Sequence, residues 1–409
     1  EWVGAIPQNW QLSKIGSLYT QRNEKVSDKD YQPLSVTMQG ILPQLATAAK
    51  TDDGDNRKLV RVGDFVINSR SDRRGSCGIS PLDGSVSLIN IILTPRTAMH
   101  PGYYNWLFHT TLFADEFYKW GHGIVADLWT TRWQEMKSIT VPVPKYAEQE
   151  RIAAFLDAEC AEIDAVLEKT RASIEEYKKL KQAVITQAVT KGVRGDRSMK
   201  DSGIEWIGEI PAEWDKDKVI RVFSVIGSGT TPKSSDENLF DGNTPWIQSG
   251  DINGEKLLVT KNCVSNSAIE SYSALKVYQA PYLVVAMYGA SVGNLSLSTI
   301  DACVNQACCV LKKPTINLKF SFYIFKAVKD YLVRKAVGGG QPNISQETIK
   351  QLWLPIPSAD EQIEISNYLD EKCSSVDVLT AKKQQYLTEI ENYKKSLIYE
   401  YVTGKKEVV

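Results

Sequence analysis

The ten residues EWVGAIPQNW at 1–10 return as EWIGEIPAEW at 205–214, and this repetition decides how the chain is divided. Six of the ten places are identical, and both tryptophans are among them. A repeat has to be recognised before a fold is assigned, because each copy is one structural unit. The chain is therefore expected to consist of two similar halves.

The repetition returns at the far end of each half. VPVPKYAEQERIAAFLD at 141–157 matches LPIPSADEQIEISNYLD at 354–370, and KQAVITQAVT at 181–190 matches KKSLIYEYVT at 394–403. The offset is 204 at the start and 213 at the end, so the second copy has gained nine residues in between. The middles of the halves resemble each other only faintly. Matched ends around different centres favour two modules that perform the same kind of task on different targets.

Composition places the chain among globular proteins. With 409 residues, 43% of them hydrophobic and 24% charged, two or more domains are expected. The net charge is −1, and the two globular parts are only slightly basic, so DNA binding is permitted without being required. No apolar run approaches the roughly 18 residues of a membrane span. The chain opens inside the repeated phrase without a methionine, so we expect further residues before Glu1.

The cysteines indicate a redox compartment. There are seven, an odd number, and no CxxC spacing occurs. This argues against a disulfide framework and against a zinc site, and favours a reducing, cytoplasmic location. The adjacent Cys308 and Cys309 stand in the apolar run CCVL and are expected to be buried strand residues.

Each half ends in a segment with the pattern of a long helix. Residues 148–189 contain neither Gly nor Pro, and apolar residues recur at steps of four and three, which predicts a heptad seam. A helix of about 40 residues outgrows a small domain. The two helices are therefore expected to pair as an intramolecular coiled coil; the alternative is that each packs on its own domain. The predicted seam residues are Ile163, Leu167, Ile174, Tyr177 and Val184 in the first helix and Val376, Leu387, Ile390 and Leu397 in the second.

The globular parts lack the motifs of common enzymes. Short apolar strands such as DFVINS and YLVVAM, separated by turns and followed by aromatic-rich helical segments, predict mixed α/β domains. Walker A, GxSxG, HExxH and Asn/Asp-Pro-Pro-aromatic motifs are absent from the sequence. All three histidines lie in the first half, whereas a two-fold repeated enzyme would place one in each copy. The sequence favours a binding and scaffolding protein over a catalyst.

The expected fold class is α+β, with two mixed α/β domains each followed by a long helix. The expected segments are a first domain at 1–146, a long helix at 147–192, a linker at 193–204, a second domain at 205–358, a second long helix at 359–403 and a tail at 404–409.

Taken with these segments, the chain resembles the specificity subunit of a type I restriction–modification enzyme. The resemblance rests on the closures VPVP…EQERI and LPIP…EQIEI, on KDSGIEWIGEIPAEW between the halves, and on GSGTTPKSS, PWIQSGDI, GASVGN and GGGQPNIS in the second half. It spans essentially all 409 residues. It departs in the first domain, where GHGIVADLWTT replaces GGGQPNIS, an arginine-rich run replaces GASVGN, and the KDSGI lead-in is missing.

The resemblance implies two target-recognition domains, each reading one half of a bipartite, asymmetric site on double-stranded DNA. The helices would lie antiparallel as a ruler and give the chain a pseudo-two-fold axis. Two modification subunits would dock on them and bring S-adenosylmethionine, and restriction subunits would bring ATP and Mg²⁺. This chain would bind no cofactor itself, catalyse nothing and contact no membrane. The alternatives are a structural adaptor with two protein-binding domains and a self-sufficient DNA-modifying enzyme.

Candidate DNA-reading residues follow from the loops that correspond in the two halves. Arg, Asn, Gln and Ser on exposed loops suit the edges of bases in the major groove. The candidates are Arg70, Arg73, Arg74, Ser76, Thr130, Thr131 and Arg132 in the first domain and Tyr288, Ser291, Asn294, Gln341 and Asn343 in the second. The alternative for the arginine run is a solvated turn with an internal ion pair to Asp72.

Overall fold

The computed structural model describes residues 2–46, 54–123, 129–252, 254–336 and 342–408. The chain separates into two compact units, Glu1–Ala172 with Lys383–Val409, and Ser173–Lys382. The dividing lines cross both long helices, so each unit holds one globular domain together with a part of each helix. Gln341 lies outside the described residues.

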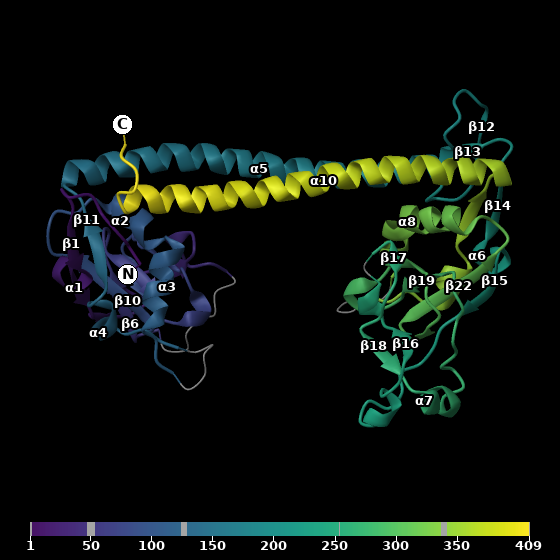
Figure 1. The fold of residues 1–409 in the computed structure, drawn as a ribbon, viewed down its shortest axis with the longest axis horizontal. Helices are drawn as coiled ribbons and strands as arrows, with labels where there is room; N and C mark the ends of the chain where they lie inside the picture. The colour runs from purple at the N-terminus through teal and green to yellow at the C-terminus, as the bar shows by residue number, and fades with distance from the viewer. Residues whose placement is uncertain (1, 47–53, 124–128, 253, 337–341, 409) are drawn as a thin grey trace. The chain divides into compact units, whose positions relative to one another are not determined.

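The first unit contains a mixed α/β domain (Figure 1). Its strands are β1 (Gln11–Lys14), β2 (Tyr19–Arg22), β3 (Lys25–Val26), β4 (Leu34–Thr37), β5 (Gly40–Pro43), β6 (Arg57–Val60), β7 (Phe65–Asn68), β8 (Cys77–Ile79), β9 (Gly84–Val86), β10 (Asn90–Pro95) and β11 (Thr140–Val143). Its helices are α1 (Ile15–Leu18), η1 (Ser71–Arg73), α2 (Pro101–Phe108), α3 (Thr111–Lys119) and α4 (Trp133–Met136), and α5 (Tyr146–Lys191) begins here. The sheets have the orders β2-β10-β7-β8, β3-β6-β9, β4-β5 and β1-β11.

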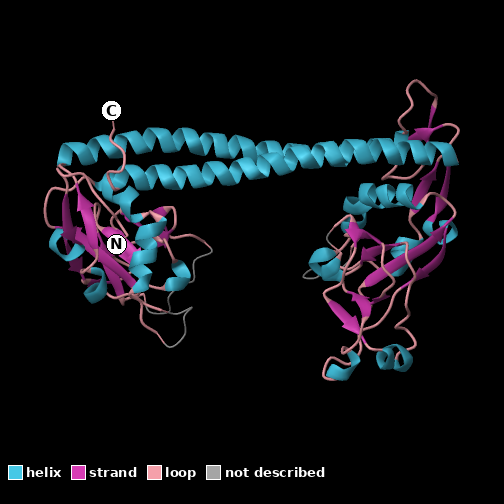
Figure 2. Cartoon of the chain, in the orientation of Figure 1, coloured by secondary structure: helices cyan, strands magenta, loops and turns pink. Residues whose placement is uncertain are grey.

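The second unit contains a related domain (Figure 2). Its strands are β12 (Met199–Asp201), β13 (Glu209–Pro211), β14 (Asp215–Lys218), β15 (Phe223–Gly227), β16 (Thr244–Ile247), β17 (Lys256–Leu257), β18 (Asn262–Val264), β19 (Tyr282–Ala286), β20 (Leu295–Ser298), β21 (Cys303–Val304), β22 (Cys308–Pro314) and β23 (Trp353–Ile356). Its helices are α6 (Val219–Val222), η3 (Glu237–Leu239), η4 (Ser249–Asp251), α7 (Asn266–Ser271), η5 (Gly289–Ser291), α8 (Leu318–Arg334) and α9 (Gln346–Lys350), and α10 (Ala359–Val402) begins here. The sheets have the orders β15-β22-β19-β20-β17, β18-β16-β21, β14-β23 and β12-β13.

The main sheet of each domain is buried on both faces. On β7, Phe65 and Ile67 belong to the aromatic core that α2 and α3 cover, whereas Val66 belongs to a smaller core on the opposite face. On β19, Leu283 packs in the core under α8, and Val284 packs in the core of the opposite face. Successive side chains of a strand point to opposite faces, so a continuous apolar run indicates a strand that is covered twice.

The two adjacent cysteines of β22 are both buried. Cys308 and Cys309 lie on opposite faces of this strand, in two different cores. Burial raises the pKa of each thiol to about 12, so both stay protonated near neutral pH. All seven cysteines of the chain are unpaired. Among the helices of the described ranges, none has the length and apolar character that crossing a membrane requires.

The second tryptophan of each repeated phrase holds the start of a long helix. Trp10 Nε1 donates to Glu148 Oε1 at 2.9 Å, and Trp214 Nε1 donates to Glu361 Oε2 at 2.9 Å. The first tryptophan of each phrase donates to a backbone carbonyl of the strand before the helix, β11 or β23. The repeated phrase is therefore the fastening between each domain and the helix that follows it.

Segments of α5 and α10 are antiparallel within the first unit. The rings of Phe155 and Tyr401 have centroids 4.5 Å apart, and Asp164 binds Lys394 at 2.6 Å, so one helix ascends in number as the other descends. The predicted seam faces inward. Leu167, Ile174, Leu387 and Leu397 are buried, and Ile163, Tyr177, Val184, Val376 and Ile390 are half-buried.

The same ion pair is made twice with the roles of the two copies exchanged. In the first unit Lys394 binds Asp164 at 2.6 Å, and in the second unit Lys181 binds Asp377 at 2.6 Å. Lys181 and Lys394 are equivalent positions of the repeat, and so are Asp164 and Asp377. Each unit thus joins a lysine of one copy to an aspartate of the other.

Candidate nucleic-acid interface

The arginine run of the first domain forms a tight loop between β7 and β8. Asn68, the last residue of β7, donates its backbone N–H to the carbonyl of Ser76 at 2.9 Å, and its Oδ1 accepts from the backbone N–H of Arg70 at 3.1 Å. Gly75 has φ +77°, a left-handed conformation that costs glycine little, and this allows the chain to turn back into β8. The backbone of the loop is fixed, while the side chains of its arginines point outward.

A second loop, distant in sequence, lies against the arginine loop. Ser71 donates its N–H to the carbonyl of Trp129 at 2.9 Å, and Thr131 donates to the carbonyl of Ser69 at 3.0 Å. Arg70 and Thr130 face each other in the bridge between these bonds. The structure therefore brings together candidates that the sequence separates by about sixty positions.

The second domain repeats this loop pair. Gly289 donates its N–H to the carbonyl of Pro342 at 3.1 Å, and Ile344 donates to the carbonyl of Met287 at 2.8 Å. Tyr288 and Asn343 face each other in the bridge, in the place that Arg70 and Thr130 occupy in the first domain. The two domains share a backbone frame and differ in the side chains that it presents.

The candidates differ in how available their side chains are. Arg70, Arg73, Arg74, Arg132, Tyr288 and Asn343 are exposed, and Thr130 and Ser291 are half-buried. Arg74 is engaged in an ion pair with Asp115. Arg73 makes a long ion pair with Asp72, at 3.8 Å, and its side chain is 68% exposed. The internal ion pair to Asp72, which is the alternative predicted for this run, is therefore present, and it leaves the Arg73 side chain mostly exposed.

Three candidates carry out structural tasks instead. Thr131 is fully buried and donates its hydroxyl to the carbonyl of Phe117 at 2.9 Å, because neighbouring residues of an extended chain point to opposite sides and Thr130 takes the outer one. Ser76 is buried at the inner side of the arginine loop. Asn294 donates to the carbonyl of Ile252 and accepts from Lys329, both at 2.9 Å, which fixes its amide within the domain. Direct base reading by Thr131 is excluded by this placement.

A cleft of about 500 Å³ lies beside the arginine loop. One wall is the β4–β5 hairpin, including Thr37 and Met38, and the other includes Arg73 and Arg74. The sequence alone does not single out this hairpin, because VTMQG carries no charge or aromatic ring. Its one visible signal is the glycine at position 40, which follows the turn with φ +105°, a conformation that favours glycine.

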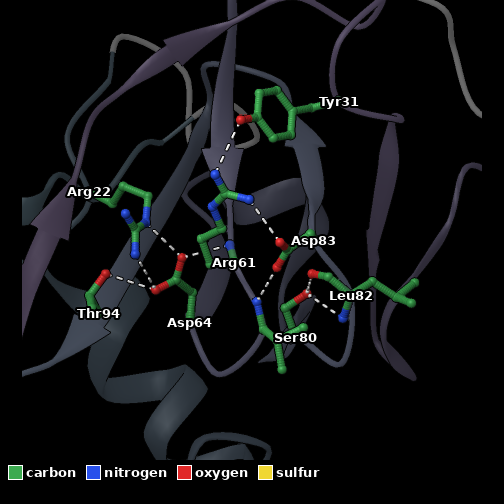
Figure 3. A network of polar contacts seen from close by, with 9 residues as sticks. Arg22, Tyr31, Arg61, Asp64, Ser80, Leu82, Asp83 and Thr94 are labelled. Atoms are coloured by element: carbon green, nitrogen blue, oxygen red, sulfur yellow. Dashed lines mark hydrogen bonds and ion pairs between the residues drawn. The ribbon is translucent and has the colours of Figure 1, made fainter.

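A buried carboxylate anchors the strand that leads into the arginine loop (Figure 3). Asp64 precedes β7 and accepts from Arg22 at 2.8 Å, from the hydroxyl of Thr94 at 2.7 Å and from the N–H of Arg61 at 2.9 Å. The hydrogen bond to Asp64 raises the pKa of the Arg22 guanidinium. This carboxylate joins β2, β10 and the β6–β7 turn, and so fixes where β7 begins.

Asp64→Ala is expected to lower the free energy of unfolding of the first domain by about 2–3 kcal/mol, because it leaves several partly buried donors without an acceptor. Denaturant unfolding monitored by tryptophan fluorescence measures the loss. The matched control is Asp83→Ala, which breaks the neighbouring ion pair to Arg61. That pair is 42% and 49% exposed at its two side chains, and we expect less than about 1 kcal/mol. Equal losses in the two variants would contradict the anchoring role of Asp64.

Comparisons with known proteins show which families the sequence is similar to. The family model described as "Type I restriction modification DNA specificity domain" matches residues 211–389. The type I restriction enzyme MjaVIII specificity subunit of Methanocaldococcus jannaschii is 25% identical over 283 residues, covering 66% of this chain and 63% of the relative. The EcoBI specificity subunit of Escherichia coli is 22% identical over 284 residues, covering 66% and 59%. The chain thus matches about three fifths of the length of these curated relatives.

Solved structures share the fold. A chain described under "Structural basis underlying complex assembly and conformational transition of the type I R-M system" superposes with a TM-score of 0.77 at 15% identity, over 98% of this chain and 100% of that one. The HsdS subunit from Thermoanaerobacter tengcongensis superposes with a TM-score of 0.52 at 16% identity, over 98% of each chain. Such likenesses establish the mixed α/β fold with long helices, while function rests on the site. Residues 211–389 thus match the family model of type I restriction–modification DNA specificity domains, and the curated relatives are specificity subunits of type I restriction enzymes.

Proposed function

We propose that this chain is the DNA sequence-recognition subunit of a type I restriction–modification complex, with each domain reading one half of a bipartite, asymmetric site on double-stranded DNA. The repeated loop pair carries the proposal. Arg70 faces Thr130 in one domain and Tyr288 faces Asn343 in the other, on the same backbone frame. Different polar side chains on one frame suit two readers of different sequences, because base edges are distinguished by side-chain donors and acceptors.

The long helices would set the distance between the two readers and carry the partner subunits. The exchanged Lys–Asp pairs support an antiparallel coiled coil with a pseudo-two-fold axis. An uninterrupted helix of 46 residues is about 69 Å long, close to two turns of B-form DNA. On α10, Tyr386 and Tyr393 are 50% and 56% exposed. Exposed tyrosines are enriched at protein interfaces, so they support the docking of two modification subunits here.

The chemistry would belong to the partners. The modification subunits would bind S-adenosylmethionine and methylate adenine, and the restriction subunits would bind ATP and Mg²⁺ for translocation and cleavage. Methylation inside a duplex requires the base to leave the stack, so a recognition subunit contributes by placing the DNA. This chain would then act without a cofactor and without catalysing a step. The unpaired cysteines support a place for the complex in the cytoplasm.

The test is a pair of double variants assembled with the modification subunits. Arg70→Ala with Arg73→Ala should relax base preference in one half-site only, and Tyr288→Ala with Asn343→Ala in the other half-site only. Each lost base contact is worth about 1–3 kcal/mol of discrimination. Methylation of a duplex library with randomised half-sites, read by sequencing, measures both preferences at once. Each variant is the control for the other, and relaxation of both halves by one variant would contradict two independent readers.

The purified chain, alone and with its modification subunits, also tests the two alternative functions. If the purified chain methylated duplex DNA without partners, the self-sufficient enzyme would be favoured. If the chain with its modification subunits showed no salt-dependent binding to duplex DNA, the protein-binding adaptor would be favoured, because phosphate contacts release counterions and must weaken as salt rises.

A further inference from the structure

The tip of the β4–β5 hairpin is held rigidly at the rim of the cleft in the first domain. The Thr37 hydroxyl donates to the carbonyl of Gly40 at 2.9 Å and accepts from the N–H of Gln39 at 3.1 Å. The tip also rests on β8, where a Cβ added to Gly78 would lie 2.9 Å from the Cα of Gly40. Two glycines in contact leave the hairpin little freedom to move toward the sheet.

Met38 is presented to solvent by this rigid turn. It is 72% exposed, among the most exposed of the large apolar side chains of the described residues. Its Cε lies 3.9 Å from the place of a Cβ on Gly75, so the side chain reaches over the arginine loop. Because the backbone of this turn is fixed, a ligand that covers Met38 has only the side chain itself to order.

The cleft behind the tip is polar. Its lining includes Asn68, Ser87 and Asn90. The Oδ1 of Asn90 is buried and has no hydrogen-bond partner among the described residues. Such a floor suits a ligand with polar edges better than an apolar peptide, because an apolar group would leave these groups unpaired. Arg73 also lines the cleft, and its side chain is 68% exposed.

We propose that Met38 and Arg73 read neighbouring base pairs in the major groove, with Met38 against the methyl group of a thymine and Arg73 donating to O6 and N7 of a guanine. This rests on the proposed function and adds to it the bases that the first domain selects. A two-stranded ribbon is narrow enough to enter the major groove. Arginine to guanine is the commonest base-specific contact, and apolar side chains distinguish thymine by its methyl group. We assign the guanine contact to Arg73 and not to Arg74, because Arg74 is paired with Asp115 from another helix.

The experiment uses the full chain with its modification subunits and a randomised duplex library. The half-site that the first domain selects is expected to contain a guanine and a thymine at adjacent or next-adjacent pairs. Arg73→Ala should reduce the preference for that guanine by about 10- to 100-fold, and Met38→Ala should reduce the preference for that thymine by about 5-fold, each at one position only. Arg74→Ala is the matched control and should leave base preference unchanged.

Altered bases test the contacts atom by atom. In the wild type, 7-deazaguanine, which lacks N7 but keeps O6, should reproduce part of the loss caused by Arg73→Ala. Uracil, which lacks the thymine methyl, should reproduce the loss caused by Met38→Ala. In Arg73→Ala and in Met38→Ala the matching altered base should cause no further loss. Circular dichroism and melting temperature should be unchanged, because both side chains are exposed.

Three outcomes would overturn the inference. They are a first half-site without guanine, an Arg73→Ala variant that weakens all sequences equally with a smaller salt dependence, and a Met38→Ala variant that still distinguishes thymine from uracil. In each case the two half-sites would remain selected, and the proposed function would stand. If the wild-type complex showed no sequence preference in either half-site, the proposed function itself would be refuted.

Discussion

Inserting one heptad after Ala172 in α5 and one after Gln385 in α10 is expected to weaken binding to the original site by at least about 100-fold, while both half-site sequences stay the same. These positions lie midway between the two exchanged Lys–Asp pairs, so each pair keeps its partner. A heptad preserves the seam because the apolar repeat is seven residues long. Seven residues add about 10.5 Å to each helix, so a site that still fits one domain is misplaced for the other.

A library with fixed half-sites and variable spacers measures the shift. The preferred spacer is expected to lengthen by about 3 base pairs, since one turn of about 10.5 base pairs spans roughly 34–36 Å. The added twist also rotates the second half-site, so the best new site is expected to bind more weakly than the original. The matched control inserts seven residues at Gly195, which is exposed and has open space around it. An unchanged spacer in the double-heptad variant would end the proposal that the helices measure distance.

Glu361→Ala is expected to lower the stability of the second domain by about 3–5 kcal/mol, the loss seen when one partner of a buried ion pair is removed. The side chain of Glu361 is 3% exposed, and Oε1 accepts from Arg197 at 2.5 Å while Oε2 accepts from Trp214 at 2.9 Å. The guanidinium of Arg197 also lies over the Trp214 ring. Removing the carboxylate leaves a guanidinium and an indole N–H without their acceptor.

Denaturant unfolding followed by tryptophan fluorescence measures this loss, because Trp214 is hydrogen-bonded to Glu361. Glu213→Ala is the matched control, because Glu213 binds the same Arg197 at 2.9 Å but is 56% exposed. It is expected to cost less than about 1 kcal/mol. If Glu361→Ala and Glu213→Ala were equally stable, the contact between α10 and the second domain would not depend on the buried carboxylate of Glu361.

The long helices and the repeat could be predicted from sequence because their signals are local and periodic. Residues 148–189 carry no helix-breaking residue, and α5 runs through them without interruption. The seam followed from apolar spacing alone, and its members are buried or half-buried. The repeated tryptophans marked an element that recurs, although their acceptors, Glu148 and Glu361, were not foreseen. Those carboxylates look like ordinary charged residues in the first turn of a helix.

The candidate interface could be predicted only in part. The sequence indicates which loops correspond in the two halves, but the bonds that join Ser71 to Trp129 connect distant segments and leave no local pattern. Thr131 was misplaced because composition does not tell which of two adjacent threonines points inward. The cleft beside Met38 depends on the contact between Gly40 and Gly78, two residues from different strands. Such features arise from tertiary packing, which periodicity does not record.

The loop pairs are joined through main-chain atoms, at Ser71 and Trp129 in one domain and at Gly289 and Pro342 in the other. Main-chain bonds do not depend on which side chain a residue carries. New sequence preferences can therefore evolve by exchanging the outward side chains one at a time, with the loops keeping their shape throughout. If the chain reads DNA as proposed, a host lineage would gain a different DNA recognition sequence while the protein stays folded at every step.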